Sequence, residues 1–194
     1  DTGGQVKYVL EMLQNLSLHP QVRKVDLFTR KISDRRVSSA YEKEIEVVNE
    51  KARIIRISCG GNAYRPKEVL WDHLDEFIDK TIRFIDEEAD FPDVVHGHHA
   101  DGNYLASQVS EIFGIPFLAT SHSLGRNKKN LLLQEGMTQE KINEKFNMER
   151  RIAVEESLLE TADMVVVSTQ SIIDSQYSLY EKFKSARFKV IPPG

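Results

Sequence analysis

Segments with strand-like and helix-like patterns alternate along most of the chain, and this order is the strongest constraint on the fold. Short apolar segments indicate buried strands, and segments with apolar residues at helical spacing lie between them. Such alternation is typical of a parallel sheet with helices on both faces, so we predict an α/β fold. The predicted strands are 24–29, 53–58, 93–97, 116–120, 164–168 and 188–191, and the predicted helices are 5–18, 67–88, 102–113, 139–162 and 170–182.

One segment departs from the pattern. Residues 31–51 are charged and lack a clear period, so we expect a surface excursion, for which a hairpin is one possible form. The length of 194 residues is enough to bury a core and fits a single domain. Both ends are interpreted as cut, because residues 1–4 start within a loop without a methionine and residues 191–194 stop at a strand-to-linker transition.

Composition excludes several classes of protein. The net charge of −4 gives no overall attraction to nucleic acid or to an anionic membrane, so any anion must be bound by local cations. Cys59 is the lone cysteine, which excludes an internal disulfide. No apolar run approaches the roughly 20 residues of a membrane span. We therefore expect a cytoplasmic protein that binds neither nucleic acid nor membrane.

Polar loops follow several of the predicted strands and are expected to meet at one edge of the sheet, where ligands of open α/β sheets bind. They are Gly3-Gly4-Gln5, Gly60-Gly61, 96–101 and His122-Ser123. Gly4 precedes a predicted helix, so backbone N–H groups there could face an oxyanion or a sugar hydroxyl, although a simple steric turn explains the glycines equally well. The segment 120–129 combines an imidazole, a glycine and several cations, which indicates a site for a phosphorylated polyol.

Three histidines lie within four residues, but their spacing does not favour a metal site. His96, His98 and His99 follow a strand whose side chains alternate in direction, so at best His96 and His98 share a face. No cysteine and no helical His-x3-His pair completes a tetrahedral set, and we predict no metal. A structural role or a hydrogen bond to ligand hydroxyls is expected instead. Asp101 could cap the next helix or accept a hydrogen bond from a sugar.

Other catalytic and nucleotide-binding motifs are missing from the sequence. There is no Gly-x-Ser-x-Gly segment, and His122 has no evident acidic partner, which argues against hydrolase chemistry. Gly3-Gly4 completes neither Gly-x-Gly-x-x-Gly nor a P-loop. We therefore expect no dinucleotide or nucleoside triphosphate site in this domain.

Four separated motifs, taken together, resemble the sucrose-phosphate synthase family. They are 1–9, 96–101, 122–128 and 150–152, and they occur in the family's order across essentially the whole chain. The resemblance implies a Rossmann-like, three-layer αβα domain with a mainly parallel sheet. Residues 1–194 would form the N-terminal, acceptor-binding half of a two-domain GT-B glycosyltransferase. The resemblance implies that a C-terminal nucleotide-sugar domain would lie outside this sequence.

The activity implied by the resemblance is transfer of glucose from UDP-glucose to fructose 6-phosphate. The products would be sucrose 6-phosphate and UDP, with retained anomeric configuration. UDP-glucose would be the donor substrate, held mainly by the other domain, and no tightly bound cofactor is expected. The fragment alone is therefore expected to be inactive.

The resemblance also implies the site residues. His122 would face the transferred glucose and act in catalysis, while Ser123 and Lys128 would hold the acceptor phosphate. One of Arg150 and Arg151 is expected to reach the same phosphate, and we favour Arg151. His99 is also expected to contact the substrate, at a position where the resemblance implies tyrosine in many relatives. The remaining expected substrate contacts are Gly4, Gln5, Lys67 and Asp101.

Three alternatives stay open. A sucrose synthase would use unphosphorylated fructose, and a related transferase would use another phosphorylated acceptor such as an inositol phosphate. A sensor could keep the fold and bind a sugar phosphate without transfer. The cations of 126–129 favour a phosphorylated acceptor, because each charge-assisted hydrogen bond to a phosphate contributes roughly 1.5–3 kcal/mol.

Overall fold

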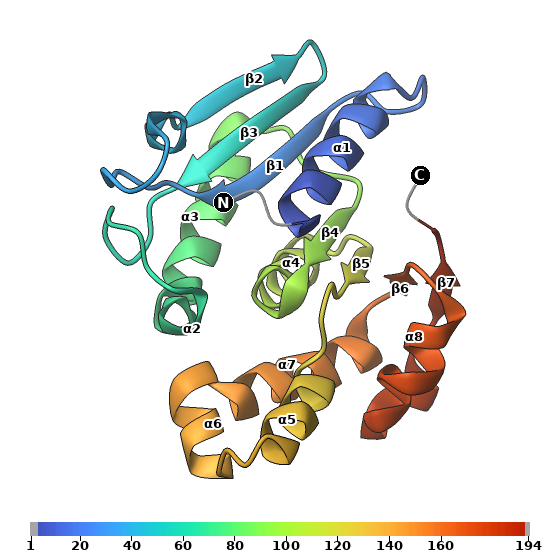
Figure 1. Cartoon of the computed structure of the whole chain (residues 1–194). Coiled ribbons are helices and arrows are strands. Elements are labelled where there is room, and N and C mark those ends of the chain that lie inside the picture. Colours follow the sequence, from blue (N-terminus) through green and yellow to red (C-terminus); the bar gives the residue numbers. More distant parts are fainter. Residues whose placement is uncertain (1–3, 193–194) are drawn as a thin grey trace. The chain divides into compact units, whose positions relative to one another are not determined.

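The computed structural model describes residues 4–192, and it divides into two compact units, Asp1–Phe84 and Ile85–Gly194 (Figure 1). Each unit has its own sheet. The predictions for Asp1–Gly3, and those for the last two residues, lie outside the described residues.

The first unit contains a three-stranded sheet in the order β1-β3-β2. β1 and β3 are parallel, whereas β2 and β3 are antiparallel. Leu13 of α1 packs with Ala52 and Ile54 of β3 in a small apolar core. The elements are α1 (Gly4–Leu18), β1 (Val25–Arg30), a 3₁₀ turn η1 (Ser39–Glu42), β2 (Ile45–Asn49), β3 (Ala52–Ile57), α2 (Lys67–Leu70), η2 (Trp71–His73) and most of α3 (Leu74–Glu88), whose last residues belong to the second unit.

The charged segment 31–51 is therefore only partly an excursion, because its end forms β2. This strand makes a hairpin with β3, the strand that follows it. The predicted helix 67–88 has the expected extent, but the 3₁₀ turn η2 interrupts it between α2 and α3.

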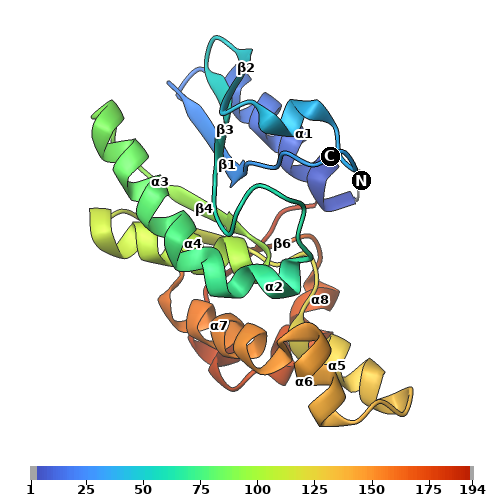
Figure 2. The same ribbon diagram turned by 90° about the vertical axis from the view of Figure 1, so that its left-hand side faces the viewer.

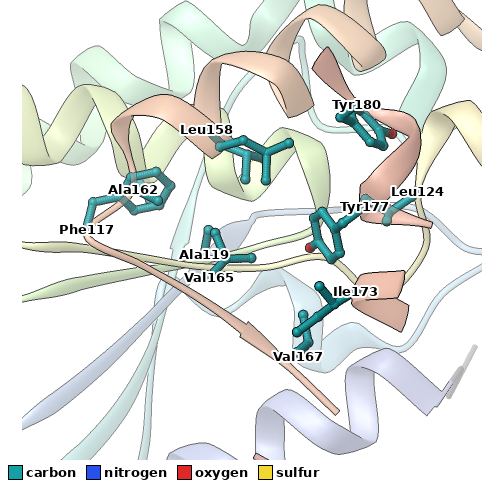
Figure 3. Packing of buried hydrophobic residues seen from close by; sticks show 12 residues of the cluster. Phe117, Ala119, Leu124, Leu158, Ala162, Val165, Val167, Ile173, Tyr177 and Tyr180 are labelled. Carbon is teal, nitrogen blue, oxygen red and sulfur yellow. The ribbon is translucent and has the colours of Figure 1, made fainter. Parts of the chain in front are cut away.

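The second unit contains a four-stranded, all-parallel sheet in the order β4-β5-β6-β7. Its core includes Phe117 and Ala162 at one end, and Leu124 and Tyr180 at the other (Figure 3). The elements are β4 (Val95–His98), α4 (His99–Phe113), β5 (Phe117–Thr120), α5 (Gly125–Gln134), α6 (Gln139–Phe146), α7 (Met148–Thr161), β6 (Met164–Val167), α8 (Gln170–Ser175), η3 (Tyr177–Leu179), η4 (Glu181–Ser185) and β7 (Phe188–Val190).

The predicted α/β class with a mainly parallel sheet is confirmed, since β2–β3 is the single antiparallel pairing within residues 4–192. Three helical predictions need correction. The helix expected at 139–162 is divided into α6 and α7 by Asn147, whose backbone is left-handed at φ 48°. The helix expected at 170–182 continues after α8 as two 3₁₀ turns, and α5 forms where no helix was predicted.

Within residues 4–192, no helix combines the length and apolar character needed to cross a membrane.

Candidate functional site

The ends of β4 and β5 bring three histidines together. His96 and His98 lie on β4, and their ring centroids are 4.3 Å apart. His122 follows β5, and its ring stacks on that of His98 at a centroid distance of 5.4 Å. His98 Nδ1 lies 3.2 Å from His122 Nε2, and His96 Nε2 lies 2.8 Å from Thr120 Oγ1. Parallel pairing of His98 with Thr120 explains why these rings meet.

These imidazoles are neutral near pH 7. Burial lowers the pKa of His96 to about 4 and that of His98 to about 3, and it also lowers the pKa of His122. In the contact between neutral His98 and His122, one ring nitrogen donates a proton and the other accepts it. The contact therefore fixes the orientation of the exposed His122 ring, which can exchange hydrogen bonds with a sugar but carries no charge.

These pKa shifts predict a pH-dependent stability. The ordinary histidine pKa of 6.5 lies above the folded values of His96 and His98, so between about pH 6.5 and 4 the unfolded chain binds protons that the folded protein does not. The free energy of unfolding should therefore be highest above pH 6.5 and fall on acidification, by on the order of 3 kcal/mol for this pair. Urea unfolding of wild type and His98→Asn at pH 7 and 4.5 measures this, and equal pH dependence of the two proteins would contradict it.

No group of three or more His, Cys, Asp or Glu side chains in the described part of the chain is arranged to hold a metal ion. The ring nitrogens of His98 and His122 contact each other directly.

Asn103 of α4 contacts the ends of both β4 and β5. Its side chain is fully buried, and its Nδ2 donates to the carbonyl of Thr120 at 3.4 Å. On the β4 side it lies so close to Gly97 that a Cβ on Gly97 would be 2.6 Å from both the Cα and the Oδ1 of Asn103. Gly97 thus allows α4 to approach the strand that carries His96 and His98.

His99 and Asp101 lie at the start of α4. His99 is buried and has a left-handed backbone at φ 66°, and its Nδ1 accepts a hydrogen bond from the Ala100 N–H at 2.8 Å. Asp101 lies in the first turn, because α4 starts two residues before it and takes His98 as its N-cap. Asp101 Oδ1 lies 3.5 Å from His99 Nδ1. Of the two roles left open for Asp101, the structure excludes the helix cap, and contact with a sugar stays a prediction.

Arg151 of α7 holds the loop that follows β5. Its Nη2 donates to the carbonyl of Ser123 at 2.6 Å and to its Oγ at 3.0 Å, and its Nε donates to Glu155 at 2.9 Å. Arg151 is only 5% exposed, whereas His122 and Ser123 are exposed. The contacts that the structure gives to this arginine are therefore internal to the protein, and its contact with a phosphate stays a prediction.

Lys128 lies on α5, which packs with α6 and α7 (Figure 2). Its Nζ is 3.8 Å from the ring centroid of Phe146, so a cation–π contact holds the ammonium group. Arg126, two residues earlier, pairs with Glu156 at 2.6 Å. Arg150 is partly exposed on α7. Since α5 begins at Gly125, Lys128 lies one turn into the helix that follows Ser123.

Three of the expected substrate-binding residues belong to the first unit, where they lie at the starts of two helices. Gly4 is the first residue of α1 and Gln5 the second, and Lys67 is the first residue of α2. Their substrate contacts stay predictions. In the same unit, Arg30 donates from Nε to the carbonyl of Cys59 at 2.9 Å and from Nη2 to that of Gly61 at 2.7 Å. This arginine fixes the loop after β3.

Glu155, which was not predicted from the sequence, is 1% exposed, and it accepts a hydrogen bond from the Gly125 N–H at the end of the loop that carries Ser123. The four-residue spacing of Arg151 and Glu155 on a predicted helix is a signal that could have indicated their pairing. The other side chain that contacts Glu155 is that of Tyr180, which lies 25 residues further along the chain. No sequence pattern indicates that these two residues are in contact.

Comparison with known proteins assigns the chain to a family. A family model described as the sucrose synthase first GT-B domain matches residues 1–191. Sucrose-phosphate synthase 4 of Arabidopsis thaliana is 40% identical over 205 residues, covering 94% of this chain and 20% of the relative. Sucrose-phosphate synthase of Zea mays is 37% identical over 217 residues, covering 98% of this chain and 20% of the relative. The chain thus spans about one fifth of the length of the curated relatives that it matches.

A solved structure agrees with the family match. Sucrose-phosphate synthase from Thermosynechococcus elongatus superposes with a TM-score of 0.75 at 25% identity, covering 98% of this chain and 43% of that one. The fold is therefore that of one half of a GT-B glycosyltransferase. Within that class, the chain belongs to the family of sucrose synthase first GT-B domains.

Proposed function

We propose that the whole protein transfers glucose from UDP-glucose to fructose 6-phosphate, giving sucrose 6-phosphate and UDP with retention, and that this chain is the acceptor-binding half. The support is the 40% identity to a sucrose-phosphate synthase together with the placement of the segment 120–128. That segment is the observation that carries the proposal, because it presents His122, Ser123 and Lys128 on one loop and the helix after it.

The acceptor phosphate would be recognised by side chains of this segment. The N–H of Gly125 donates to Glu155, and that of Arg126 donates to the hydroxyl of Tyr180. Because the first two N–H groups of α5 are thus committed within the protein, recognition would fall to Ser123 Oγ and Lys128 Nζ. A phosphate monoester carries a charge of about −1.5 to −2 at neutral pH, which a lysine complements.

His122 would face the transferred glucose. Its low pKa keeps the ring neutral, so it would orient the sugar by hydrogen bonds and would not neutralise a departing diphosphate. Stabilisation of UDP as it leaves would come from the nucleotide-sugar domain of the whole protein. Catalysis would then depend on holding acceptor and donor in register and on charge stabilisation of the leaving group. We expect the whole protein to act in the cytoplasm without a tightly bound cofactor.

A sucrose synthase activity is the second candidate, favoured by the description of the matching family model. Its acceptor would be fructose, which has no phosphate for Lys128 to bind. The two candidates therefore differ in whether Lys128 affects the use of the acceptor.

The test is Lys128→Ala in the whole protein. Loss of one charge-assisted contact should raise the KM for fructose 6-phosphate about 10-fold or more, because such a contact contributes roughly 1.5–3 kcal/mol. The KM for UDP-glucose should stay within about 2-fold. Lys129→Ala, one residue further along α5, is the matched control and should behave as wild type. An unchanged KM for fructose 6-phosphate in Lys128→Ala would contradict the proposed phosphate contact.

A further inference from the structure

The carboxylate of Glu155 is surrounded by hydrogen-bond donors. Its Oε2 accepts from the Gly125 N–H at 2.9 Å and from the hydroxyl of Tyr180, and its Oε1 accepts from Arg151 Nε at 2.9 Å. Since every one of these partners donates, the group that fits here is an ionised carboxylate.

The donors come from three separate parts of the second unit. Gly125 begins α5, directly after the loop of His122 and Ser123, while Arg151 belongs to α7 and Tyr180 follows η3. Packing at Gly125 is tight, because a Cβ there would lie 2.8 Å from Glu155 Oε2. Glu155 thus anchors the end of the loop, and through Arg151 it reaches the carbonyl and the hydroxyl of Ser123.

We propose that Glu155 is a positioning residue for the acceptor: it fixes Arg151 and Gly125 so that the exposed Ser123 hydroxyl is presented to the acceptor phosphate. This inference rests on the proposed function. Glu155 is 1% exposed and acts only through its partners, so it touches no substrate itself.

The hydrogen bonds around Glu155 support a positioning role over one in which the side chain only fills space. A buried charged pair gives little stability compared with apolar side chains of the same volume, whereas it fixes the direction of each hydrogen bond. Here the directions matter, because one rigid guanidinium donates from Nε to Glu155 and from Nη2 to the Ser123 hydroxyl.

The first experiment is Glu155→Gln in the whole protein, assayed with fructose 6-phosphate and UDP-glucose. An amide would place donor hydrogens against the donors of Arg151 or Gly125 and loosen the loop. We expect the KM for fructose 6-phosphate to rise about 10-fold, with kcat and the KM for UDP-glucose within about 2-fold of wild type. Glu160→Gln is the matched control, because Glu160 lies on the same helix, is exposed and pairs with Lys182. If Glu155→Gln lowers thermal stability but leaves this KM unchanged, the inference is overturned.

Tyr180→Phe is the second variant, and it decides the matter if Glu155→Gln does not fold. It removes one donor to Glu155 while keeping the ring in the core, and it should raise the same KM by a smaller factor. In a Ser123→Ala background both substitutions should have no further effect on this KM, because they act through the Ser123 hydroxyl. Equal effects with and without that hydroxyl would overturn the inference, as would an unchanged KM in Ser123→Ala alone. Failure of the proposed function would be seen separately, as no transfer to fructose 6-phosphate by wild type.

Discussion

Replacing Gly97 with alanine is expected to lower the free energy of unfolding by about 3 kcal/mol or more. The new Cβ would lie 2.6 Å from the Cα of Asn103 and 2.7 Å from the carbonyl oxygen of Gly102, and both are backbone atoms of α4. Backbone atoms cannot rotate away as a side chain does, so α4 would have to move off β4. Urea unfolding measures the loss.

Gly102→Ala is the matched control for this prediction. Gly102 lies on α4, and a Cβ there would meet nothing within 4 Å. Alanine is favoured over glycine inside a helix by roughly 0.8–1 kcal/mol, so this variant should be as stable as wild type or more stable. Equal stabilities of Gly97→Ala and Gly102→Ala would contradict the packing described at the end of β4.

Replacing Arg151 with methionine is expected to lower the free energy of unfolding by about 3–5 kcal/mol. Methionine keeps much of the volume of the side chain but removes the guanidinium. Glu155, which is 1% exposed, would then lose one of its hydrogen-bond donors, and the Ser123 carbonyl would lose its 2.6 Å hydrogen bond. Chemical unfolding of the purified protein, followed by circular dichroism, measures the change.

Arg150→Met provides the comparison, because Arg150 is the preceding residue of α7 and is partly exposed. Its effect on stability should stay below about 1 kcal/mol. Similar decreases in the free energy of unfolding of the two variants would mean that the Arg151–Glu155 pair does not stabilise the fold. Arg151→Met is expected to lower the stability and also to move the loop of Ser123. A higher KM for fructose 6-phosphate in this variant would therefore not by itself show that Arg151 contacts the phosphate. Lys128 and Ser123 give the cleaner tests of phosphate binding.

The order of strands and helices could be predicted from the sequence because it depends on local periodicity. Apolar runs such as 117–120 and 164–167 form strands close to the predicted positions. The breaks in the helices could not be predicted in the same way. Asn147 adopts a left-handed backbone that is open to several residue types, and α5 has only partial apolar patterning, so local pattern did not distinguish either from its alternative.

In the candidate site, too, local features could be predicted from the sequence, whereas contacts that depend on tertiary packing could not. That His96 and His98 share a face follows from strand alternation, and the adjacency of the loops after β4 and β5 follows from parallel pairing. The contact of His98 with His122 depends on the register between β4 and β5, which cannot be read from the sequence. The burial of Arg151 depends on the angular position of α7 against the loop of Ser123. Long-range packing therefore decided which of the expected residues face inward.

The most direct test of the account is the acceptor preference of the whole protein. With UDP-glucose as donor, fructose and fructose 6-phosphate are compared as acceptors, and sucrose and sucrose 6-phosphate are quantified. Phosphate recognition by Ser123 and Lys128 predicts a kcat/KM at least about 10-fold higher for fructose 6-phosphate, because a single charge-assisted contact contributes that much. Equal or better use of fructose would contradict the account and assign the protein to sucrose synthase chemistry.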